Sequence, residues 1–448
     1  MTTQNTSRGV QRSLDLYQQA LDLIPGATQL ISRRPTRFAY GVSPVYASRA
    51  RGSRIWDVDG NVFLDWMSSV GAIVLGYADD VVDTAVKEQI DASAIYSLNH
   101  ELEVELAEEL IRTIPSAEMV RYAKGGGEAC AIAVRIARGT TGRDKVLFCG
   151  YHGWHDWYLA ANLATDDRLD DHLFPGIEPI GVPKALAGTS YPFPYGDLPA
   201  LEQLLQRHQG EVAAIIMEPM RSSRPPAGYL EGVQDLAKRE QVALIFDEVT
   251  SGFRPALGGL QEYLGVTPDM TVLAKAMSNG YSMGAVVGKR WVMEPASRMF
   301  ISSTYWSDTL GITAALTTIR ELRRRNAIEH VHQIGRLLKE GINAALDEVE
   351  LDGECAGADW HPSLHFHVAD PTLRQQVLTL YIQEMAKRGI IAPHAFYLNA
   401  AHSEEDVGQT VAAAQEAFTT IRVALDSNRV AERLEAQIVE EPFRRLVT

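Results

Sequence analysis

The sequence contains only three cysteines, and none of them belongs to a Cys-x-x-Cys pair. This scarcity excludes a disulfide framework and favours reduced thiols. No apolar run approaches the roughly 20 residues that a membrane-spanning helix needs. No apolar segment of the signal-peptide type follows the first residues, so secretion is not expected. These absences together predict a cytoplasmic protein without a membrane partner.

Basic residues are also scarce relative to acidic ones. The sequence has 42 Lys and Arg but 57 Asp and Glu, which gives a formal net charge of -15. Such a charge argues against nucleic acid as a partner and is compatible with a neutral or cationic small molecule. We find no internal repeat and no low-complexity segment. With 448 residues, of which 46% are hydrophobic, the chain can bury a large core, and we expect one large domain and a smaller one.

Helical and strand patterns alternate through the middle of the chain, which favours a parallel sheet covered by helices. Apolar runs at 212–217 and 242–246 predict buried strands, and each is followed by an acidic residue, Glu218 or Asp247. Residues 53–65 predict a hairpin, and residues 162–196 predict a long surface loop. We assign residues 1–65 to an N-terminal arm and hairpin of the small domain, 66–330 to the large domain and 331–448 to the rest of the small domain.

Three segments carry candidate chemistry. The glycines at 125, 126 and 127 stand between a predicted strand and helix, where small residues let backbone N–H groups approach a phosphate; the GxGxxG spacing of dinucleotide sites is absent. Lys275 has apolar neighbours that would desolvate its amine, although an isolated lysine of this kind is usually a snorkelling side chain. Asp247 ends a buried strand, so it must be paired or protonated unless it merely caps a helix.

Taken jointly, these segments resemble a known family. The run from Asp247 to Arg254, the Leu-Ala-Lys-Ala segment around Lys275 and the glycine-rich stretch 279–284 are similar to the signature of class III aminotransferases. The likeness is greatest to the glutamate-1-semialdehyde aminomutase-like branch. It implies an α/β fold of the fold type I class of pyridoxal-phosphate (PLP) enzymes, with a mainly parallel seven-stranded sheet covered by helices and a smaller α+β domain. It also implies a homodimer with shared active sites.

The resemblance implies pyridoxal 5'-phosphate as the cofactor, together with roles for individual residues. Lys275 would hold the cofactor as an imine and shuttle a proton. Asp247 would keep the ring nitrogen protonated, so that the ring accepts electrons from the substrate. The remaining cofactor-binding candidates are Gly125, Gly126, Gly127, Tyr151 (stacked on the ring), Val249 (behind the ring), Glu218 (bordering the cofactor) and Thr304 (reaching the phosphate of the neighbouring subunit).

One departure from the family affects the phosphate site, because relatives commonly have Ser-Gly-Thr where this chain has three glycines, Gly125 to Gly127. Phosphate binding should then depend more on backbone amides and on Thr304. The nearby His152, His155 and Asp156 suggest a metal site, but no further ligand set accompanies them, so we expect no metal.

The substrate is less constrained than the cofactor. Arg33 or Arg34 occupies the region where semialdehyde aminomutases carry a carboxylate-binding arginine, and Arg221 is a further candidate. The aromatic segment with Trp154, Trp157 and Tyr158 resembles relatives that act on sugar-derived carbonyl compounds, including aminoglycoside-pathway enzymes; core packing explains these rings equally well. We expect an aminotransferase that moves an amino group from an amino-acid donor to a carbonyl acceptor. The alternative is an aminomutase or a PLP epimerase. A third hypothesis is a non-catalytic sugar-binding relative.

Overall fold

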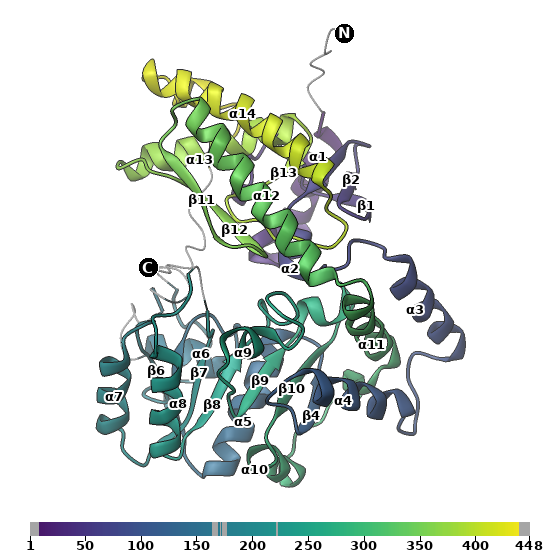
Figure 1. Cartoon of the computed structure of the whole chain (residues 1–448), viewed down its shortest axis with the longest axis vertical. Coiled ribbons are helices and arrows are strands. Elements are labelled where there is room, and N and C mark those ends of the chain that lie inside the picture. Colours follow the sequence, from purple (N-terminus) through teal and green to yellow (C-terminus); the bar gives the residue numbers. More distant parts are fainter. Residues whose placement is uncertain (1–8, 164–168, 171, 173–176, 221–222, 439–448) are drawn as a thin grey trace. The chain divides into compact units, whose positions relative to one another are not determined.

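The computed structural model describes residues 9–163, 169–170, 172, 177–220 and 223–438 (Figure 1). The chain divides into two compact units. The large unit comprises Asp80–Ile328, and the small unit comprises the chain up to Asp79 together with the part that begins at Glu329. Residues 66–79, which the sequence assigned to the large domain, therefore pack with the small unit.

The large unit is built on a seven-stranded sheet with the order β4-β10-β9-β8-β7-β5-β6. Strand β10 is antiparallel to both of its neighbours, and the pairs β9/β8, β8/β7, β7/β5 and β5/β6 are parallel. This confirms the mainly parallel seven-stranded sheet. The strands are β4 (Met119–Ala123), β5 (Lys145–Cys149), β6 (Ser190–Pro192), β7 (Val212–Met217), β8 (Ala243–Asp247), β9 (Met270–Leu273) and β10 (Gly284–Gly288).

Helices cover both faces of this sheet, as parallel strands that are buried on both sides require. Alternate residues of β5 show the arrangement: Val146 and Phe148 belong to a core cluster with α5, whereas Leu147 and Cys149 belong to a second cluster with α7 and α8. The helices of this unit are α3 (Asp80–Ala92), α4 (Glu101–Thr113), α5 (Gly126–Thr141), α6 (Asp156–Leu159), α7 (Leu198–Arg207), α8 (Tyr229–Arg239), α9 (Gly259–Leu264), α10 (Arg290–Met293) and α11 (Thr309–Arg324).

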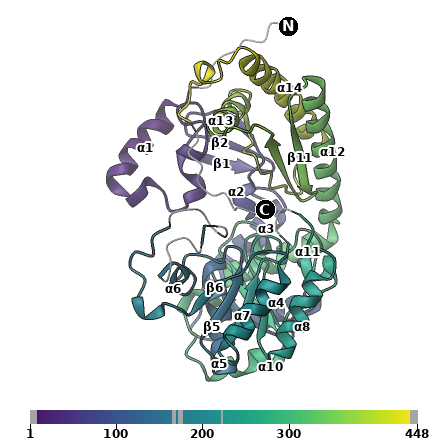
Figure 2. The same cartoon turned by 90° about the vertical axis from the view of Figure 1, so that its left-hand side faces the viewer.

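The small unit combines short sheets with long helices (Figure 2). Its four-stranded sheet has the order β1-β2-β3-β13, and β2 and β3 form the predicted hairpin. The strands are β1 (Ala47–Arg51), β2 (Arg54–Asp57), β3 (Val62–Asp65), β11 (Gly353–Ala358), β12 (His361–Phe366) and β13 (Ile390–Ile391). The helices are α1 (Gln11–Leu23), α2 (Ser68–Gly71), α13 (Pro371–Lys387), α14 (Glu404–Asp426) and most of α12 (Ala327–Glu348).

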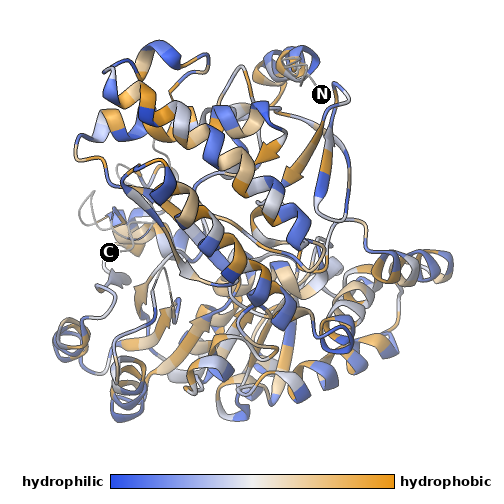
Figure 3. Cartoon of the chain, turned by 45° about the horizontal axis from the view of Figure 1, so that its top comes forward, coloured by the Kyte–Doolittle hydropathy of each residue, from blue (hydrophilic) through white to orange (hydrophobic). Residues whose placement is uncertain are grey.

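Hydropathy along the helices alternates between hydrophilic and hydrophobic residues (Figure 3). This is the pattern of helices that bury one side and expose the other. Within the described part of the chain, no helix is both long enough and apolar enough to cross a lipid bilayer.

Candidate active site

Three of the predicted site residues lie at the ends of neighbouring strands of the large sheet. Glu218 comes directly after β7, Asp247 is the last residue of β8, and Lys275 follows β9 after one alanine. Strands β8 and β9 run parallel, and Asp247 lies opposite Val272 in their ladder. Because carboxyl ends of parallel strands meet at one edge of a sheet, the topology brings these three residues to the same edge.

Asp247 is a buried carboxylate with three hydrogen-bond donors. His152 Nδ1 donates to Asp247 Oδ2 at 2.8 Å, and Cys130 Sγ approaches the same oxygen at 3.3 Å. The amide of Val249 donates to Oδ1 at 3.0 Å. Burial alone would raise the pKa of Asp247, but the hydrogen bonds and the charge of His152 outweigh it, so the pKa is lowered. The residue is therefore an anion.

This anion has room for one more donor. A carboxylate offers about four acceptor positions, and His152, Cys130 and Val249 use three of them. A cationic ring N–H fits the remaining position both in charge and in donor type. The residues present therefore suit the pyridinium nitrogen of PLP.

The three side chains Cys130, His152 and Asp247 also lie close enough together to share a metal ion, since their ligand atoms are within 4.8 Å of one another. Their mutual hydrogen bonds account for this proximity without a metal. Burial, followed by the charge of Asp247, raises the pKa of the Cys130 thiol well above its usual value. The thiol thus stays protonated as a donor, whereas a metal would require the thiolate.

Lys275 opens a short 3-10 helix, Lys275–Ser278, with a left-handed backbone (φ 48°). Such a φ is uncommon outside glycine and is found where the surrounding structure fixes it. The amine donates to Thr250 Oγ1 at 3.0 Å. Because Thr250 is in the loop that follows Asp247, this bond ties the lysine to the segment that carries the acid.

The three glycines form the N-terminus of α5, with Gly125 as the N-cap. A Cβ atom on Gly126 would lie only 2.6 Å from Val249 Cγ1, and one on Gly127 would lie 3.3 Å from the Cα of Gly153. Val249 and the loop after β5 therefore pack against the first helical turn, which leaves no room for a side chain at Gly126 and little at Gly127. The free N–H groups of a helix N-terminus favour a phosphate dianion.

Tyr151 and Glu218 come together at the same edge. The amide of Tyr151 donates to Glu218 Oε2 at 3.3 Å. Of the three aromatic residues considered for sugar contacts, only Trp154 is exposed, at 71%. Trp157 and Tyr158 are buried in the core cluster with α5. Their burial makes them packing residues of this chain rather than contacts for a sugar.

The remaining predicted residues lie elsewhere in the chain. Thr304 is an exposed residue at the start of a short 3-10 helix of the large unit, Thr304–Ser307. Arg33 and Arg34 are exposed residues of the small unit, and Arg33 Nη2 donates to Ser69 Oγ at 3.0 Å. Arg221 lies outside the described residues.

Ser69 belongs to a left-handed turn. Four consecutive residues, Ser68 to Gly71, have positive φ values of 45°, 52°, 57° and 80°. The carboxylate of Asp65 accepts hydrogen bonds from the amides of Met67 and Ser68, and Asn399 Nδ2 donates to Ser68 Oγ at 2.8 Å. Strained backbone of this kind persists only where its surroundings over-determine it. The turn is thus a firm support for the Arg33 guanidinium.

Three residues of the site were not assigned a role from the sequence: His152, Cys130 and Thr250. His152 was weighed only as a metal ligand, although its position beside Tyr151 was a usable signal. Cys130 lies 117 positions from Asp247 in the chain, so no local pattern connects the two. Glu248, by contrast, is a structural residue. Burial raises its pKa to about 7, and it accepts from the amides of Leu260 and Gln261.

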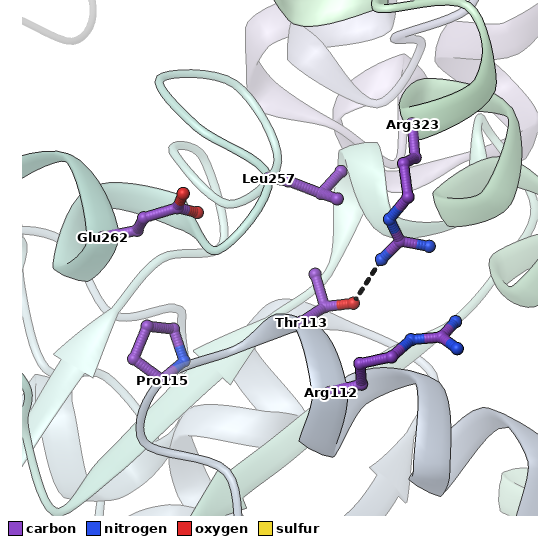
Figure 4. Close-up of a pocket in the computed structure, with 6 residues that line it drawn as sticks. All are labelled: Arg112, Thr113, Pro115, Leu257, Glu262 and Arg323. Atoms are coloured by element: carbon purple, nitrogen blue, oxygen red, sulfur yellow. Dashed lines mark hydrogen bonds between the residues drawn. The ribbon is translucent and has the colours of Figure 1, made fainter.

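A pocket in the large unit lies apart from these residues (Figure 4). It is lined by Arg112, Thr113, Pro115, Leu257, Glu262 and Arg323. Both arginines pair with the buried carboxylate of Glu109, and Arg323 also donates to Thr113. Both guanidinium groups thus have partners within the protein, and no predicted site residue lines this pocket.

Comparison with known proteins agrees with this geometry. The family model for class III aminotransferases matches residues 38–357. The chain is 35% identical over 424 residues to a 3-aminobutyryl-CoA aminotransferase of Cloacimonas acidaminovorans (92% of this chain, 98% of that protein). It is 33% identical over 431 residues to a glutamate-1-semialdehyde 2,1-aminomutase of Archaeoglobus fulgidus (91% and 100%).

Among solved structures, the PLP-carrying FumI protein of Sphingopyxis sp. MTA144 superposes with a TM-score of 0.84 at 24% identity, over 96% of this chain and 99% of that one. At this identity the likeness concerns the fold. The family match, the two relatives and the Asp247–Lys275 edge agree, and the chain therefore belongs to the class III aminotransferases, the PLP-dependent transaminases of fold type I.

Proposed function

We propose that this transaminase moves an amino group from an amino-acid donor such as glutamate to a sugar-derived aldehyde or ketone. The observation that supports amino transfer most directly is the three-donor cradle of Asp247, because it holds a permanent anion for a cationic ring nitrogen. When bound, PLP supplies an electron sink for the substrate carbon. The amine of Lys275, anchored by Thr250, moves the proton to and from that carbon.

The sugar-derived acceptor is supported by one exposed aromatic ring and by the charge of the chain. Trp154 offers a flat apolar face of the type that packs on sugar rings. The net charge of -15 attracts substrates that carry amino groups. Arg221 would be a further substrate contact.

Isomerisation is the second candidate. It is favoured by the 33–35% identity to several glutamate-1-semialdehyde 2,1-aminomutases, and by the fact that such a reaction would use the same Lys275 and Asp247. An aminomutase or epimerase differs in one measurable respect, because it releases no keto acid from a separate donor.

The test is to incubate the PLP-loaded enzyme with L-glutamate and a series of sugar aldehydes and ketones. We expect 2-oxoglutarate and aminated sugar in equal amounts. Conversion of a single amine into its isomer, with no donor present and no keto acid released, would instead establish the isomerase.

Arg33 provides a prediction about the donor. A hydrogen-bonded pair between charged groups contributes about 1.5–3 kcal/mol. If Arg33 binds the donor carboxylate, Arg33→Ala should raise the half-saturating glutamate concentration about ten- to a hundredfold. The rate at saturation should change little, because the contact exists before and during the reaction. Steady-state kinetics with glutamate as the varied substrate measures both quantities.

Arg34→Ala is the matched control, since Arg34 is the adjacent exposed arginine and shares the local backbone. We choose Arg33 because Ser69 holds its guanidinium. A large effect at Arg34 with none at Arg33 would reverse this assignment.

We further propose a homodimer in which Thr304 of one subunit binds the cofactor phosphate of the other. Thr304 lies between two large exposed side chains, Phe300 (84% exposed) and Tyr305 (66% exposed). Exposed apolar side chains that cluster are typical of interaction surfaces. A second copy that covers them would also bring Thr304 to a neighbouring site.

Sedimentation velocity tests the dimer. The Phe300→Asp variant should shift toward monomer and release PLP. The Thr304→Ala variant should stay dimeric, and its affinity for PLP should fall about two- to tenfold, which corresponds to the loss of one neutral hydrogen bond. A wild-type monomer with full activity would refute the shared site.

A further inference from the structure

The ring nitrogen Nδ1 of His155 is a candidate ligand-binding atom. The side chain is half-buried and stacks on Trp154, with ring centroids 4.5 Å apart and planes at 27°. Its Nδ1 atom is buried and has no hydrogen-bond partner among the described residues. A buried polar atom without a partner costs free energy and is uncommon in folded proteins.

The usual local explanation does not apply to this nitrogen. His155 is the N-cap residue of α6, and N-cap side chains often bond to the first amides of their helix. Here the His155 side chain makes no such bond. The imidazole is therefore not occupied by capping, and its Nδ1 atom remains available.

This nitrogen lies beside the N-terminus of α5, where the phosphate site is proposed. A Cβ atom on Gly127 would be 3.3 Å from His155 Nδ1 and 3.5 Å from Cε1. Gly127 is the second residue of a 16-residue helix, so its side-chain position faces the free N–H groups of the first turn. His155 Nδ1 thus occupies the region into which a serine or threonine at position 127 would project its hydroxyl.

We propose that His155 binds the phosphate group of the cofactor, with its ring N–H donating to a phosphate oxygen in place of the hydroxyl that position 127 lacks. This inference depends on the proposed phosphate site at Gly125–Gly127. It explains how the chain binds a phosphate monoester without hydroxyl side chains in that loop. It also explains why a histidine stands where its nitrogen is otherwise unpaired.

The charge balance is consistent with this role. Burial lowers the pKa of His155, while Glu128 and Asp156 act in the opposite direction. Without a bound phosphate the ring is therefore neutral at neutral pH. A phosphate dianion within hydrogen-bond distance favours the protonated ring, which converts the contact into a charge-assisted hydrogen bond.

A comparison of PLP with pyridoxal, which lacks the phosphate, isolates this contact. Dissociation constants of both compounds would be measured for the apoenzyme by equilibrium dialysis. We expect His155→Ala to weaken PLP binding about ten- to a hundredfold, the value of a charge-assisted hydrogen bond, and to leave pyridoxal binding nearly unchanged. His155→Asn should retain most of the affinity, because its amide nitrogen can donate from a similar position.

The control is His367→Ala, which removes an exposed histidine of the small unit that pairs with Asp352; it should change neither constant. Equal weakening of PLP and pyridoxal by His155→Ala would show a structural role, and no change would show that His155 does not touch the phosphate. Either outcome overturns the inference while PLP binding by the wild type stands. If the wild type itself does not prefer PLP to pyridoxal, the phosphate site at Gly125–Gly127 fails as well.

Discussion

The Lys275→Ala protein is expected to lose both the yellow colour of the covalently held cofactor and its aminotransferase activity. In the proposed function, Lys275 supplies the amine that bonds to the cofactor aldehyde and afterwards moves the substrate proton. Proton transfer by a positioned group alone contributes about a hundred- to ten-thousandfold to rate. We therefore expect the activity to fall about a thousandfold or more. The measurements are the absorption spectrum, borohydride trapping followed by peptide mapping, and the rate with glutamate.

Lys289→Ala is a suitable control, because Lys289 belongs to the same unit and its ammonium pairs with Asp269 at 3.0 Å. That variant should keep its colour, its borohydride-trapped peptide and its rate. If Lys275→Ala still gives a reducible covalent cofactor and turns over at the parental rate, the assignment of the active site is wrong.

The Asp247→Asn protein should bind PLP but react slowly. Asparagine keeps the shape of the buried side chain and removes the charge that we propose holds the ring nitrogen protonated. Breaking a buried charge pair by neutralising one partner costs about 3–5 kcal/mol. At about 1.36 kcal/mol per tenfold in rate, the expected loss is roughly a hundred- to several-thousandfold. Single-turnover kinetics with glutamate measures this loss apart from cofactor release.

Two comparisons make the Asp247 result specific. A cofactor methylated on its ring nitrogen carries a fixed positive charge, so it should recover much of the rate in Asp247→Asn. Glu248→Gln alters the adjacent buried carboxylate, which contacts the loop at Leu260 and Gln261; it should lower the unfolding temperature while leaving the spectrum intact. A fast Asp247→Asn enzyme would mean that another group protonates the ring.

Much of this site follows from local sequence patterns. The apolar runs that end at Glu218 and Asp247 are continuous, because parallel strands are buried on both faces. That single property identifies β7 and β8, and it places the acidic residues at their ends at the edge of the sheet where the candidate site lies. Lys275 and the three glycines were recognisable by their neighbours in the same way.

Other features were not predictable because they depend on contacts that are distant in the chain. Strand β6, Ser190–Pro192, lies in the segment expected to be a loop, and it has no apolar pattern. It is a strand because its backbone pairs with β5. The partners of Asp247 depend likewise on the packing of α5 and of the loop after β5 against β8, which no single segment specifies.

One helix start does have a local sequence signal. Helix α13 begins at Pro371, and Asp370 caps it by accepting from the amide of Leu373 at 2.7 Å. Aspartate followed by proline is a typical helix start. No such sequence signal predicts the burial of Trp157 and Tyr158, because an aromatic residue in a segment of mixed polarity is equally compatible with the surface and with the core.

The central position of β8 in the sheet affects the structure that the enzyme keeps when its cofactor is absent. Strands β9 and β7 flank β8 on both sides, while β4 and β6 form the edges. Local opening of a fold spreads from weakly held margins, and central strands exchange their amide hydrogens last. The carboxylate at the end of β8 should therefore keep its position when PLP dissociates, so that the apoenzyme can bind PLP again without refolding.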